Sequence, residues 1–504
     1  MKRQVSRRRV SACEKTGTPN GIRTRVTCVK GRRPRPLDDG GQWFAEANRE
    51  TTIPRASPRS IPRFSQPWLG TCVACHGSAM QIDVAPDDSP WRGEDFWSGT
   101  RAPVTSAMAL DPRVYTSDEF FADEQIAVFE RGWVCVGLAA EAVEGRMLVR
   151  QVGRRSILIT RSDDGVLHGH LNSCRHRGTE LADSDCDIAN TIRCPYHRWG
   201  YSLDGSLKST PRFDDVPRDD FDPADYGLVD VRVETWGVLL FACLSSDTAP
   251  LRDWLGDLPE RMEGYGLDDW SMAESQSLDI AANWKLVSEN FQEYYHLTWV
   301  HPELAKVSRV DDHYRYQGPG MYCGQTTTPV SSDDRDDWLS LPPAHGLDES
   351  DSVSGRFVAI FPNVLLSVLP NHVFVMQLDP VAPGLTRERC TWLLPPAGNG
   401  TDDESPNPAA FEQMRTFWLD VNAEDIDIVQ RGQRGLTRGA VPPGPLAPRF
   451  EEPLHRFHNM LAELMTVADP GTMVVPGGDD GSGGSLYGSG ENPSPPAIEQ
   501  SAVS

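Results

Sequence analysis

Two short segments of this chain carry paired cysteine and histidine residues at spacings that suit metal binding. Cys174 and His176 form a C-x-H arm, and after seventeen intervening residues Cys194 and His197 form a C-x-x-H arm. Thiolates and imidazoles together can hold a [2Fe–2S] cluster, in which two histidines replace two cysteines on one iron and raise the reduction potential. A structural Cys₂His₂ zinc site is the alternative. Zinc sites usually pair like ligands in each arm, whereas each arm here carries one of each, so the spacing favours the cluster.

A second group of candidate ligands lies in the other half of the chain. His296 and His301 are five residues apart, which on an ideal helix is a rotation of about 140°. The two imidazoles can therefore meet one metal only if the helix ends or distorts before Pro302. Read as a helix, the same segment places Asn290, Glu293 and His296 on one face. Two histidines and a carboxylate make the facial triad of non-haem Fe(II) sites, which leaves positions open for dioxygen and substrate. A structural or surface role for the two histidines is the alternative.

The elements that must position these residues belong to a chain with room for two or three domains. It has 504 residues, 39% of them hydrophobic, and no apolar run approaches the roughly 20 residues of a membrane span. The net charge is −23, of which residues 1–36 contribute +11 and the remainder −34. An acidic body would repel phosphate, so we expect no nucleic-acid partner, and a cationic ligand or a basic redox partner is compatible with it. Without an apolar run of span length, we expect no membrane partner. Eleven scattered cysteines argue against a disulfide framework and favour a reducing cytoplasm.

Residues 1–107 show no sustained helical or strand period, and we expect them to be a disordered or misannotated extension. The run NGIRTRVTCVKGRRPRPLDDGG looks like a translation through a transfer-RNA gene, which makes Met80 or Met108 the expected start. Residues 72–76, CVACH, match the c-type haem attachment pattern. A c-type haem needs export and a packed helical domain, and neither has a signal in this sequence, so we interpret the match as chance.

Regular patterns follow in two units. In residues 108–250, an amphipathic helix that Ser117 can cap precedes the strand-like runs RSILIT and VLHGHLN, which a turn at 163–165 joins into a hairpin. Residues 251–470 contain the strand-like runs RFVAIF, VLLSVLP and HVFVMQLDP and end in a long helix near residues 411–436. Residues 471–504 are rich in Gly, Ser and Pro, and we expect them to be disordered.

The sequence around both ligand groups resembles the α subunit of the Rieske non-haem iron oxygenases (ring-hydroxylating oxygenases). CRHRGTEL and CPYHRWGYSLDG are similar to the Rieske [2Fe–2S] motif, and NWK…ENF…E-x-x-H-x₄-H is similar to the family's mononuclear-iron segment. The resemblance covers roughly residues 110–470. It implies an α+β fold with a β-rich Rieske domain and a helix-grip (START-like) catalytic domain around a curved antiparallel sheet. The implied cofactors are a [2Fe–2S] cluster on Cys174, His176, Cys194 and His197, and a mononuclear Fe(II).

The resemblance also implies a carboxylate that accompanies the two histidines on this iron. The family places it in an acidic helical stretch ahead of a Q-x-G-L signature, which begins here at Gln433. Asp425, eight residues before Gln433, matches best, and Glu424 and Asp427 are its competitors.

Two further residues gain roles from the family. Glu293 stands where the family has an acidic bridge between a mononuclear-iron histidine and a cluster histidine, here His197, of the neighbouring subunit in a trimer. The variant Glu293→Gln should therefore keep both metals and lose turnover. Asn290, one turn earlier, is expected to line the site. The implied partners are an NAD(P)H-dependent reductase or ferredoxin, dioxygen and a small-molecule substrate, in a homotrimer with or without a β subunit.

The substrate prediction depends on Glu293. Aromatic-ring dioxygenases of the family usually have Asp at the bridging position, whereas Glu followed by Y-Y-H is closer to the branch of choline, glycine betaine and carnitine monooxygenases. Such enzymes hydroxylate quaternary amines and so cause N-demethylation or C–N cleavage. Aromatic side chains bind quaternary ammonium through cation–π attraction, and the candidates are Tyr294, Tyr295, Trp299, Tyr314, Tyr316, Tyr322 and Phe374. An aromatic-ring hydroxylating dioxygenase and a Rieske electron-transfer protein without oxygenase activity are the alternatives.

Overall fold

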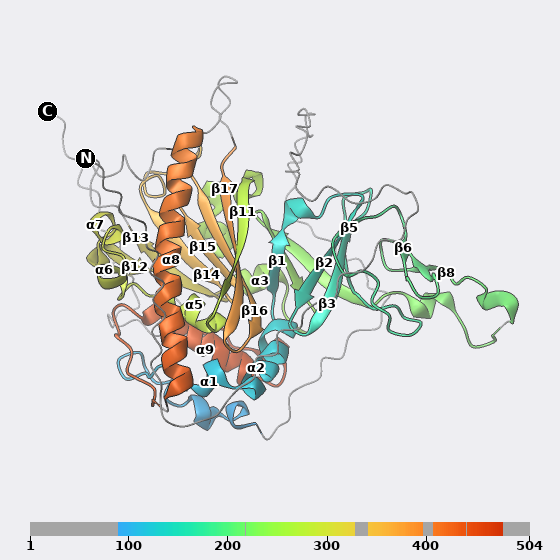
Figure 1. Cartoon of the computed structure of the whole chain (residues 1–504), viewed down its shortest axis with the longest axis horizontal. Helices are drawn as coiled ribbons and strands as arrows, with labels where there is room; N and C mark the ends of the chain where they lie inside the picture. Colours follow the sequence, from blue (N-terminus) through green and yellow to red (C-terminus); the bar gives the residue numbers. More distant parts are fainter. Residues whose placement is uncertain (1–88, 217, 328–340, 397–406, 440, 477–504) are drawn as a thin grey trace, which may run out of the picture. The chain divides into compact units, whose positions relative to one another are not determined.

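The computed structural model describes residues 89–216, 218–327, 341–396, 407–439 and 441–476 (Figure 1). The CVACH run lies outside these ranges. So do most of the two sequence ends that were expected to be disordered, of which the structure describes only residues 89–107 and 471–476. Within them the chain forms two seven-stranded antiparallel sheets and one three-stranded sheet. The described helices include none with the length and apolar character that crossing a membrane requires.

The packed chain begins before residue 108, where the sequence predicted the first domain to start. Two short 3₁₀ turns, η1 (Pro90–Arg92) and η2 (Glu94–Trp97), bury the indoles of Trp91 and Trp97. Trp91 Nε1 donates a hydrogen bond to Asp123 Oδ2 at 2.7 Å, and its ring meets that of Phe120 edge-on at 5.2 Å. Turns of three and four residues have no repeating apolar face, and single aromatic side chains attach them to the core. No periodic pattern in the sequence could therefore predict them.

A capped helix connects this segment to the first sheet, as the sequence predicted. After α1 (Arg113–Thr116), the Ser117 hydroxyl accepts a hydrogen bond from the backbone N–H of Phe120 and starts α2 (Asp118–Glu124). The turns then widen into a π-helical segment, η3 (Gln125–Glu130), whose residues are all buried.

The first sheet has the strand order β1-β10-β9-β4-β3-β2-β5. The predicted hairpin is confirmed, since β3 and β4 pair antiparallel across a turn in which Gly165 has a φ of +86°. A separate sheet, β6-β7-β8, carries the second cysteine–histidine arm in the connection between β6 and β7. The strands are β1 (Val134–Leu138), β2 (Arg146–Val152), β3 (Arg155–Arg161), β4 (Leu167–Leu171), β5 (Cys186–Asp187), β6 (Ile192–Arg193), β7 (Gly200–Tyr201), β8 (Leu207–Ser209), β9 (Asp230–Trp236) and β10 (Leu239–Cys243).

The second seven-stranded sheet has the order β11-β17-β16-β15-β14-β13-β12, with every neighbouring pair antiparallel. Its central strands β15 and β14 are almost wholly apolar, so both of their faces are covered. The strands are β11 (Ser271–Ile280), β12 (His313–Arg315), β13 (Tyr322–Thr327), β14 (Gly355–Ile360), β15 (Val364–Val368), β16 (Val373–Ala382) and β17 (Leu385–Leu394). With its helices, this curled sheet is the predicted helix-grip catalytic unit.

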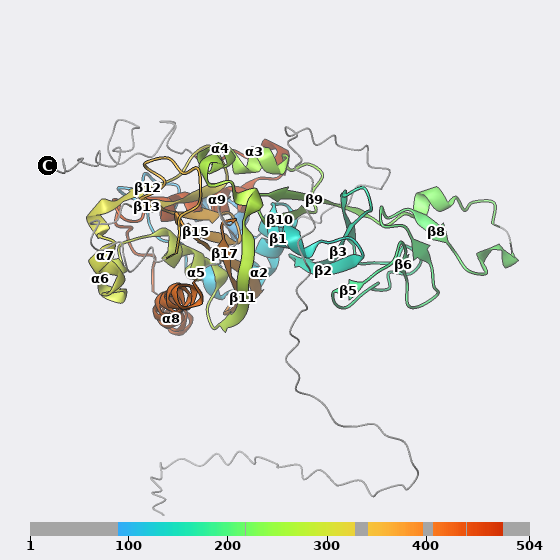
Figure 2. The same cartoon turned by 90° about the horizontal axis from the view of Figure 1, so that it is seen from above.

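Three helices pack against this sheet. In Figure 2, α8 (Pro408–Arg438) is seen nearly end-on beside α5 (Trp284–Gln292), which lies against β14, β16 and β13. The long helix predicted near residues 411–436 is therefore confirmed, and α9 (Glu452–Thr466), which the sequence analysis did not predict, packs on β13 and α5. The shorter helices are α3 (Leu251–Leu255), α4 (Leu258–Arg261), α6 (Leu297–Val300) and α7 (Leu304–Val307).

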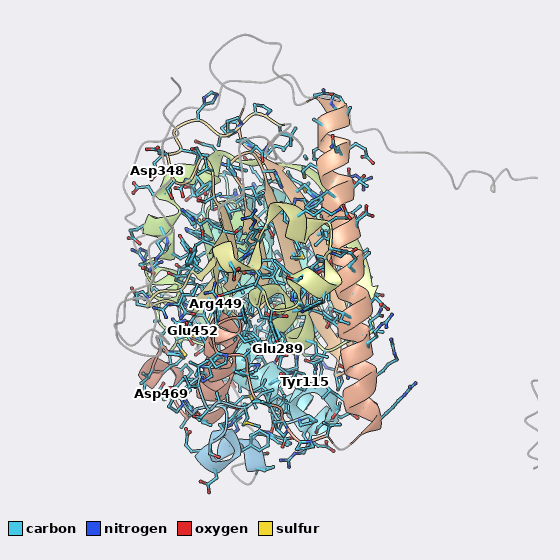
Figure 3. All side chains as sticks on the ribbon, turned by 90° about the vertical axis from the view of Figure 1, so that its left-hand side faces the viewer. Tyr115, Glu289, Asp348, Arg449, Glu452 and Asp469 are labelled. Atoms are coloured by element: carbon cyan, nitrogen blue, oxygen red, sulfur yellow. The ribbon has the colours of Figure 1, made fainter. Side chains whose placement is uncertain are left out.

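Buried polar contacts connect the N-terminal helices to α5, which leads into the second ligand group. Lys285 Nζ and Glu124 Oε2 are 2.6 Å apart, and both side chains are fully buried. Tyr115 Oη donates to Glu289 Oε1 at 2.7 Å, and these two residues are labelled close together in Figure 3. Because an unpaired buried charge is costly, these contacts fix α5 relative to α1 and α2.

Candidate functional site

The first ligand group is formed by two tight loops. The Cys174 carbonyl accepts a hydrogen bond from Gly178 N–H at 2.8 Å, and the Cys194 carbonyl accepts one from Arg198 N–H at 3.1 Å. Gly178 and Arg198 have left-handed φ angles of +69° and +61°, which turn each loop back toward its own cysteine.

The four donor groups separate into a thiol pair and an imidazole pair. Cys174 and Cys194 are buried and in contact with one another, and burial raises the pKa of the Cys174 thiol. The rings of His176 and His197 are 4.8 Å apart between centroids. This arrangement fits a [2Fe–2S] cluster in which one iron takes two thiolates and the other takes two imidazoles.

Aromatic side chains surround these loops. The Tyr201 hydroxyl lies 3.1 Å from Cys174 Sγ, where it can donate a hydrogen bond to the thiolate sulfur and so raise the potential of a cluster. Trp199 is buried and stacks on the His176 ring at 4.7 Å and 10°. It also meets the ring of Phe213 edge-on at 5.5 Å, so its contacts are those of a packing residue that excludes water.

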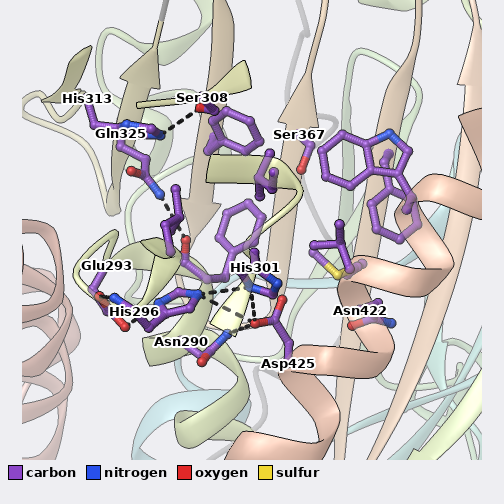
Figure 4. Close-up of a pocket in the computed structure, with 18 residues that line it drawn as sticks. Asn290, Glu293, His296, His301, Ser308, His313, Gln325, Ser367, Asn422 and Asp425 are labelled. Carbon is purple, nitrogen blue, oxygen red and sulfur yellow. Dashed lines mark hydrogen bonds and ion pairs between the residues drawn. The ribbon is translucent and has the colours of Figure 1, made fainter. Parts of the chain in front are cut away.

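The second ligand group brings three donor atoms from distant parts of the chain to one point. His301 Nε2 lies 2.8 Å from Asp425 Oδ1 and 3.2 Å from His296 Nε2, and His296 Nε2 lies 3.5 Å from Asp425 Oδ1. Figure 4 shows the three side chains converging. Atoms this close, from two histidines and one carboxylate, fit the facial triad of a mononuclear Fe(II). Of the three acids considered, Asp425 is the one whose side chain lies between the two histidines.

The charges of this group are coupled. Burial acts to lower the pKa of both histidines, but the carboxylates around them together outweigh it. Asp425 and Glu293 raise the pKa of His296 to about 10, and Asp425 and Glu424 raise that of His301. For Asp425, burial acts to raise the pKa, and the two histidines lower it overall. The two histidines therefore hold protons that a divalent cation would displace, while Asp425 is already a carboxylate.

A carboxylate lies against the outer nitrogen of each histidine. Glu293 Oε1 is hydrogen-bonded to His296 Nδ1, and Glu424 Oε2 lies 2.7 Å from His301 Nδ1. Such contacts hold the imidazole with its Nε2 directed at the metal and increase its basicity. Glu424, a competitor for the ligand position on sequence grounds, therefore contacts a ligand from the outside. Asp427 instead pairs with Arg431 on the exposed side of α8.

The backbone between Asn290 and His296 differs from the continuous helix that the sequence predicted. The helix α5 ends at Gln292, and Glu293 has extended backbone angles (φ −104°, ψ 156°). The contact between Glu293 and His296 is therefore made across a turn, in which Glu293 accepts hydrogen bonds from the N–H groups of Tyr295 and His296, and not along one helix face. Asn290 remains on α5 and donates from Nδ2 to Asp425 Oδ1 at 2.6 Å, so it lines the site as expected.

A cavity that opens to solvent lies beside the triad. Apolar and aromatic side chains dominate its wall, including Phe291, Phe357, Phe374 and Trp418. The Phe374 and Trp418 rings stack at 5.4 Å and 24°, and Phe357 lies 6.4 Å from Trp418. An apolar cavity with a few polar groups suits a small organic molecule.

The aromatic candidates from the sequence fall mostly outside this cavity. Of the seven, Phe374 alone is among the residues that form the described wall. The Trp299 side chain is 80% exposed and that of Tyr295 is 52% exposed. Tyr294 is buried, but its hydroxyl donates to the Arg449 carbonyl, and Tyr322 donates to Asp257. The sequence did not predict the other aromatic residues of the cavity, which are Phe291, Phe357 and Trp418. They come from α5, β14 and α8, so no local sequence pattern connects them.

Two protein-family profiles match the chain over the parts that hold the two ligand groups. The Rieske [2Fe–2S] domain matches residues 132–219, and the catalytic domain of the ring hydroxylating alpha subunit matches residues 267–467. All four residues of the cluster arms and all three of the triad lie inside these ranges.

Characterised relatives and solved structures extend the match. The glycine betaine monooxygenase oxygenase subunit of Pseudomonas aeruginosa is 27% identical over 395 residues, which are 71% of this chain and 89% of the relative. The carnitine monooxygenase oxygenase subunit of Acinetobacter baumannii is 32% identical over 47% of this chain and 64% of its own length. A solved quaternary ammonium Rieske monooxygenase aligns with a TM-score of 0.61 and 25% identity, over 76% of this chain and 100% of the other. Naphthalene 1,2-dioxygenase from Rhodococcus shares the fold, with a TM-score of 0.57 and 20% identity over 72% and 95%.

Proposed function

Because the chain belongs to the Rieske non-haem iron oxygenases, with a Rieske domain and a catalytic α-subunit domain in one polypeptide, we propose that it hydroxylates a quaternary amine beside the nitrogen. The resulting product would lose a methyl group as formaldehyde or break at a C–N bond. The observation that carries the proposal is the aromatic wall of Phe357, Phe374 and Trp418 in the cavity beside the triad. These rings contact one another and form one aromatic surface, against which an ammonium group can lie within the roughly 6 Å of a ring centroid that cation–π attraction requires. Relatives named for glycine betaine and carnitine support it.

Each residue of the two centres has a defined task in this proposal. His296, His301 and Asp425 would hold the mononuclear iron, which supplies the dioxygen-activating chemistry when bound, while the cluster supplies an electron. Asn290 holds the Asp425 carboxylate in place through its amide. The carboxylate of Glu293 keeps the His296 ring oriented. The electrons come from a separate reductase, as is typical of the family.

We further propose that the working unit is a homotrimer in which the Rieske tip of one copy docks beside Glu293 of the next. Exposed aromatic side chains occur at both surfaces: Trp299 and Tyr295 beside the triad, and Tyr196, which is 58% exposed, beside His197. Tyr and Trp are enriched at protein–protein interfaces relative to the rest of the surface. The solved quaternary ammonium Rieske monooxygenase, which aligns with this chain over its full length, is itself described as using inter-subunit electron transfer.

A single turnover of the reduced protein tests the proposed reaction. The anaerobically purified protein would be reduced chemically and then given dioxygen with quaternary amines in one sample and aromatic acids in another. We expect formaldehyde or a cleaved amine in the first sample and no hydroxylated acid in the second, by mass spectrometry. A hydroxylated ring, with the amines unchanged, would contradict the proposal.

Iron content separates the proposed oxygenase from an electron carrier. The oxygenase requires three irons per chain, two in the cluster and one in the triad. The variant Asp425→Ala should retain the two cluster irons and their visible absorption while it loses the third. A wild-type content of two irons would indicate a Rieske carrier instead.

A further inference from the structure

Four residues that face the cavity form one continuous row across the second seven-stranded sheet. Gln325 on β13 pairs with Phe357 on β14, Phe357 pairs with Ser367 on β15, and Ser367 pairs with Phe374 on β16. Directly paired residues share a face of the sheet, with their Cβ atoms about 4.5–5.5 Å apart. All four residues line the cavity. We call them the cross-strand row.

The middle of this row is a polar atom between aromatic rings. Ser367 stands between Phe357 and Phe374 on the sheet, and the Trp418 ring of α8 lies against both of these rings. The indole of Trp418 is fixed by a hydrogen bond from its Nε1 to His372 Nε2 at 2.7 Å. An ammonium group held by these rings would therefore have a hydroxyl group within its immediate surroundings.

Two buried oxygen atoms of the row have no hydrogen-bond partner in the described protein. They are Ser367 Oγ, on a fully buried residue, and Gln325 Oε1, on a residue that is 5% exposed. Gln325 Nε2 donates to the Phe291 carbonyl, which fixes the amide orientation because only the NH₂ group can donate to a carbonyl. Gln325 Oε1 is therefore an acceptor, open to a donor from a ligand or an ordered water in the cavity. Figure 4 labels both residues on the wall of the cavity.

The described part of the cavity wall offers a carboxylate no lysine or arginine side chain. Its own carboxylates, Asp425 and Glu293, lie at the triad, where a bound Fe(II) would offset the charge of its ligand Asp425. His313, which lies near Ser308, is neutral: burial lowers its pKa to about 4, and its Nδ1 donates to the Arg309 carbonyl. A carboxylate at the cross-strand row would lose its hydration and face the acceptor Gln325 Oε1.

We propose that this cavity selects an ammonium compound whose second polar group is an uncharged hydroxyl or amide donor, bound by Gln325 and Ser367, over one that ends in a carboxylate. This inference rests on the proposed oxidation of an ammonium substrate and specifies which member of that class the site accepts. The ammonium group lies against the rings and the hydroxyl of the same molecule bonds to Ser367 between them, while Gln325 Oε1, two strands away on β13, accepts from a water that this hydroxyl orders.

Binding to the intact iron-loaded protein, measured anaerobically by titration calorimetry, tests this inference without turnover. The two main probes are choline and glycine betaine, which share a trimethylammonium group and differ in a CH₂OH or a carboxylate. We expect choline to bind at least about tenfold more tightly than glycine betaine. Ser367→Ala should weaken choline binding about tenfold, the usual loss for one buried hydrogen bond, and leave tetramethylammonium binding unchanged. Ser275→Ala, in the same sheet but away from the cavity wall, is the matched control.

The outcomes distinguish this inference from the proposed function. Glycine betaine binding as tightly as choline would overturn the inference, and so would a Ser367→Ala variant that binds choline like the wild type. In either case, binding of tetramethylammonium would still support an ammonium substrate. If 3,3-dimethylbutanol, the uncharged analogue of choline, binds as tightly as choline and tetramethylammonium does not bind, both the inference and the proposed ammonium substrate fail.

Discussion

The contact between Glu424 and His301 predicts that this glutamate controls iron affinity without being a ligand. Glu424 Oε2 lies 2.7 Å from His301 Nδ1, while Nε2 of the same ring faces Asp425. Loss of a carboxylate partner behind a metal-binding histidine usually costs about 10–100-fold in metal affinity. The Glu424 side chain is 45% exposed, so solvent screens the contact and the lower limit applies. We therefore expect Glu424→Gln to weaken Fe(II) binding about tenfold, or about 1.4 kcal/mol.

The assay is a competition between the anaerobic protein and an Fe(II) chelator. Cluster absorption serves as an internal measure of folding. The matched control is Asp427→Asn, which removes an acid from the same helix that pairs with Arg431 and contacts neither histidine. At saturating iron, Glu424→Gln should turn over like the wild type, whereas Glu293→Gln should bind iron and fail to turn over. Iron affinity in Glu424→Gln within twofold of the wild type, or an equal loss in Asp427→Asn, would refute the reasoning.

Three further predictions concern stability and pH. Lys285→Met should lower the free energy of unfolding by about 3–5 kcal/mol because it leaves Glu124 buried without its partner, and Glu124→Gln added to it should restore part of the loss in urea titrations. A chain shortened to begin at Met108 should lose at least about 3 kcal/mol, since it lacks the buried indoles of Trp91 and Trp97, and its melting temperature should fall below that of the full chain. Fe(II) affinity should rise with pH between about 6 and 8, because the raised pKa values keep the triad histidines protonated until the metal displaces their protons. A chelator titration that gives the same affinity across this range would contradict the third prediction.

The sequence predicted the parts of the site that are local. Each cysteine–histidine arm lies within four residues, and a short loop is sufficient to bring its two donors together. The capped helix at Ser117 and the β3–β4 hairpin are local in the same sense, and the structure confirms both. The break after Gln292 was placed too late, because its position depends on Glu293 accepting hydrogen bonds from the next turn.

The parts that the sequence could not predict depend on register and on helix rotation. Adjacent residues on α8 point about 100° apart, so the choice between Glu424 and Asp425 depends on how the helix is rotated against α5. The family resemblance favoured Asp425, and the geometry gives the reason. The wall of the cavity depends on strand pairing over more than forty residues, since Gln325 meets Phe374 only through β14 and β15. Single-strand patterns contain none of this information.

The two histidines of the triad are held by different elements: α8 holds His301, and the turn after α5 holds His296. Both ring nitrogens of His301 face consecutive residues of α8, Glu424 and Asp425, so one long helix determines the position of that imidazole. The outer nitrogen of His296 instead faces Glu293, in the turn that follows α5. A change in this turn therefore moves one ligand and leaves the other two in place. Because the proposed docking surface for a neighbouring copy lies on the same turn, contact with a partner can act on His296 alone, while α8 keeps the rest of the triad together.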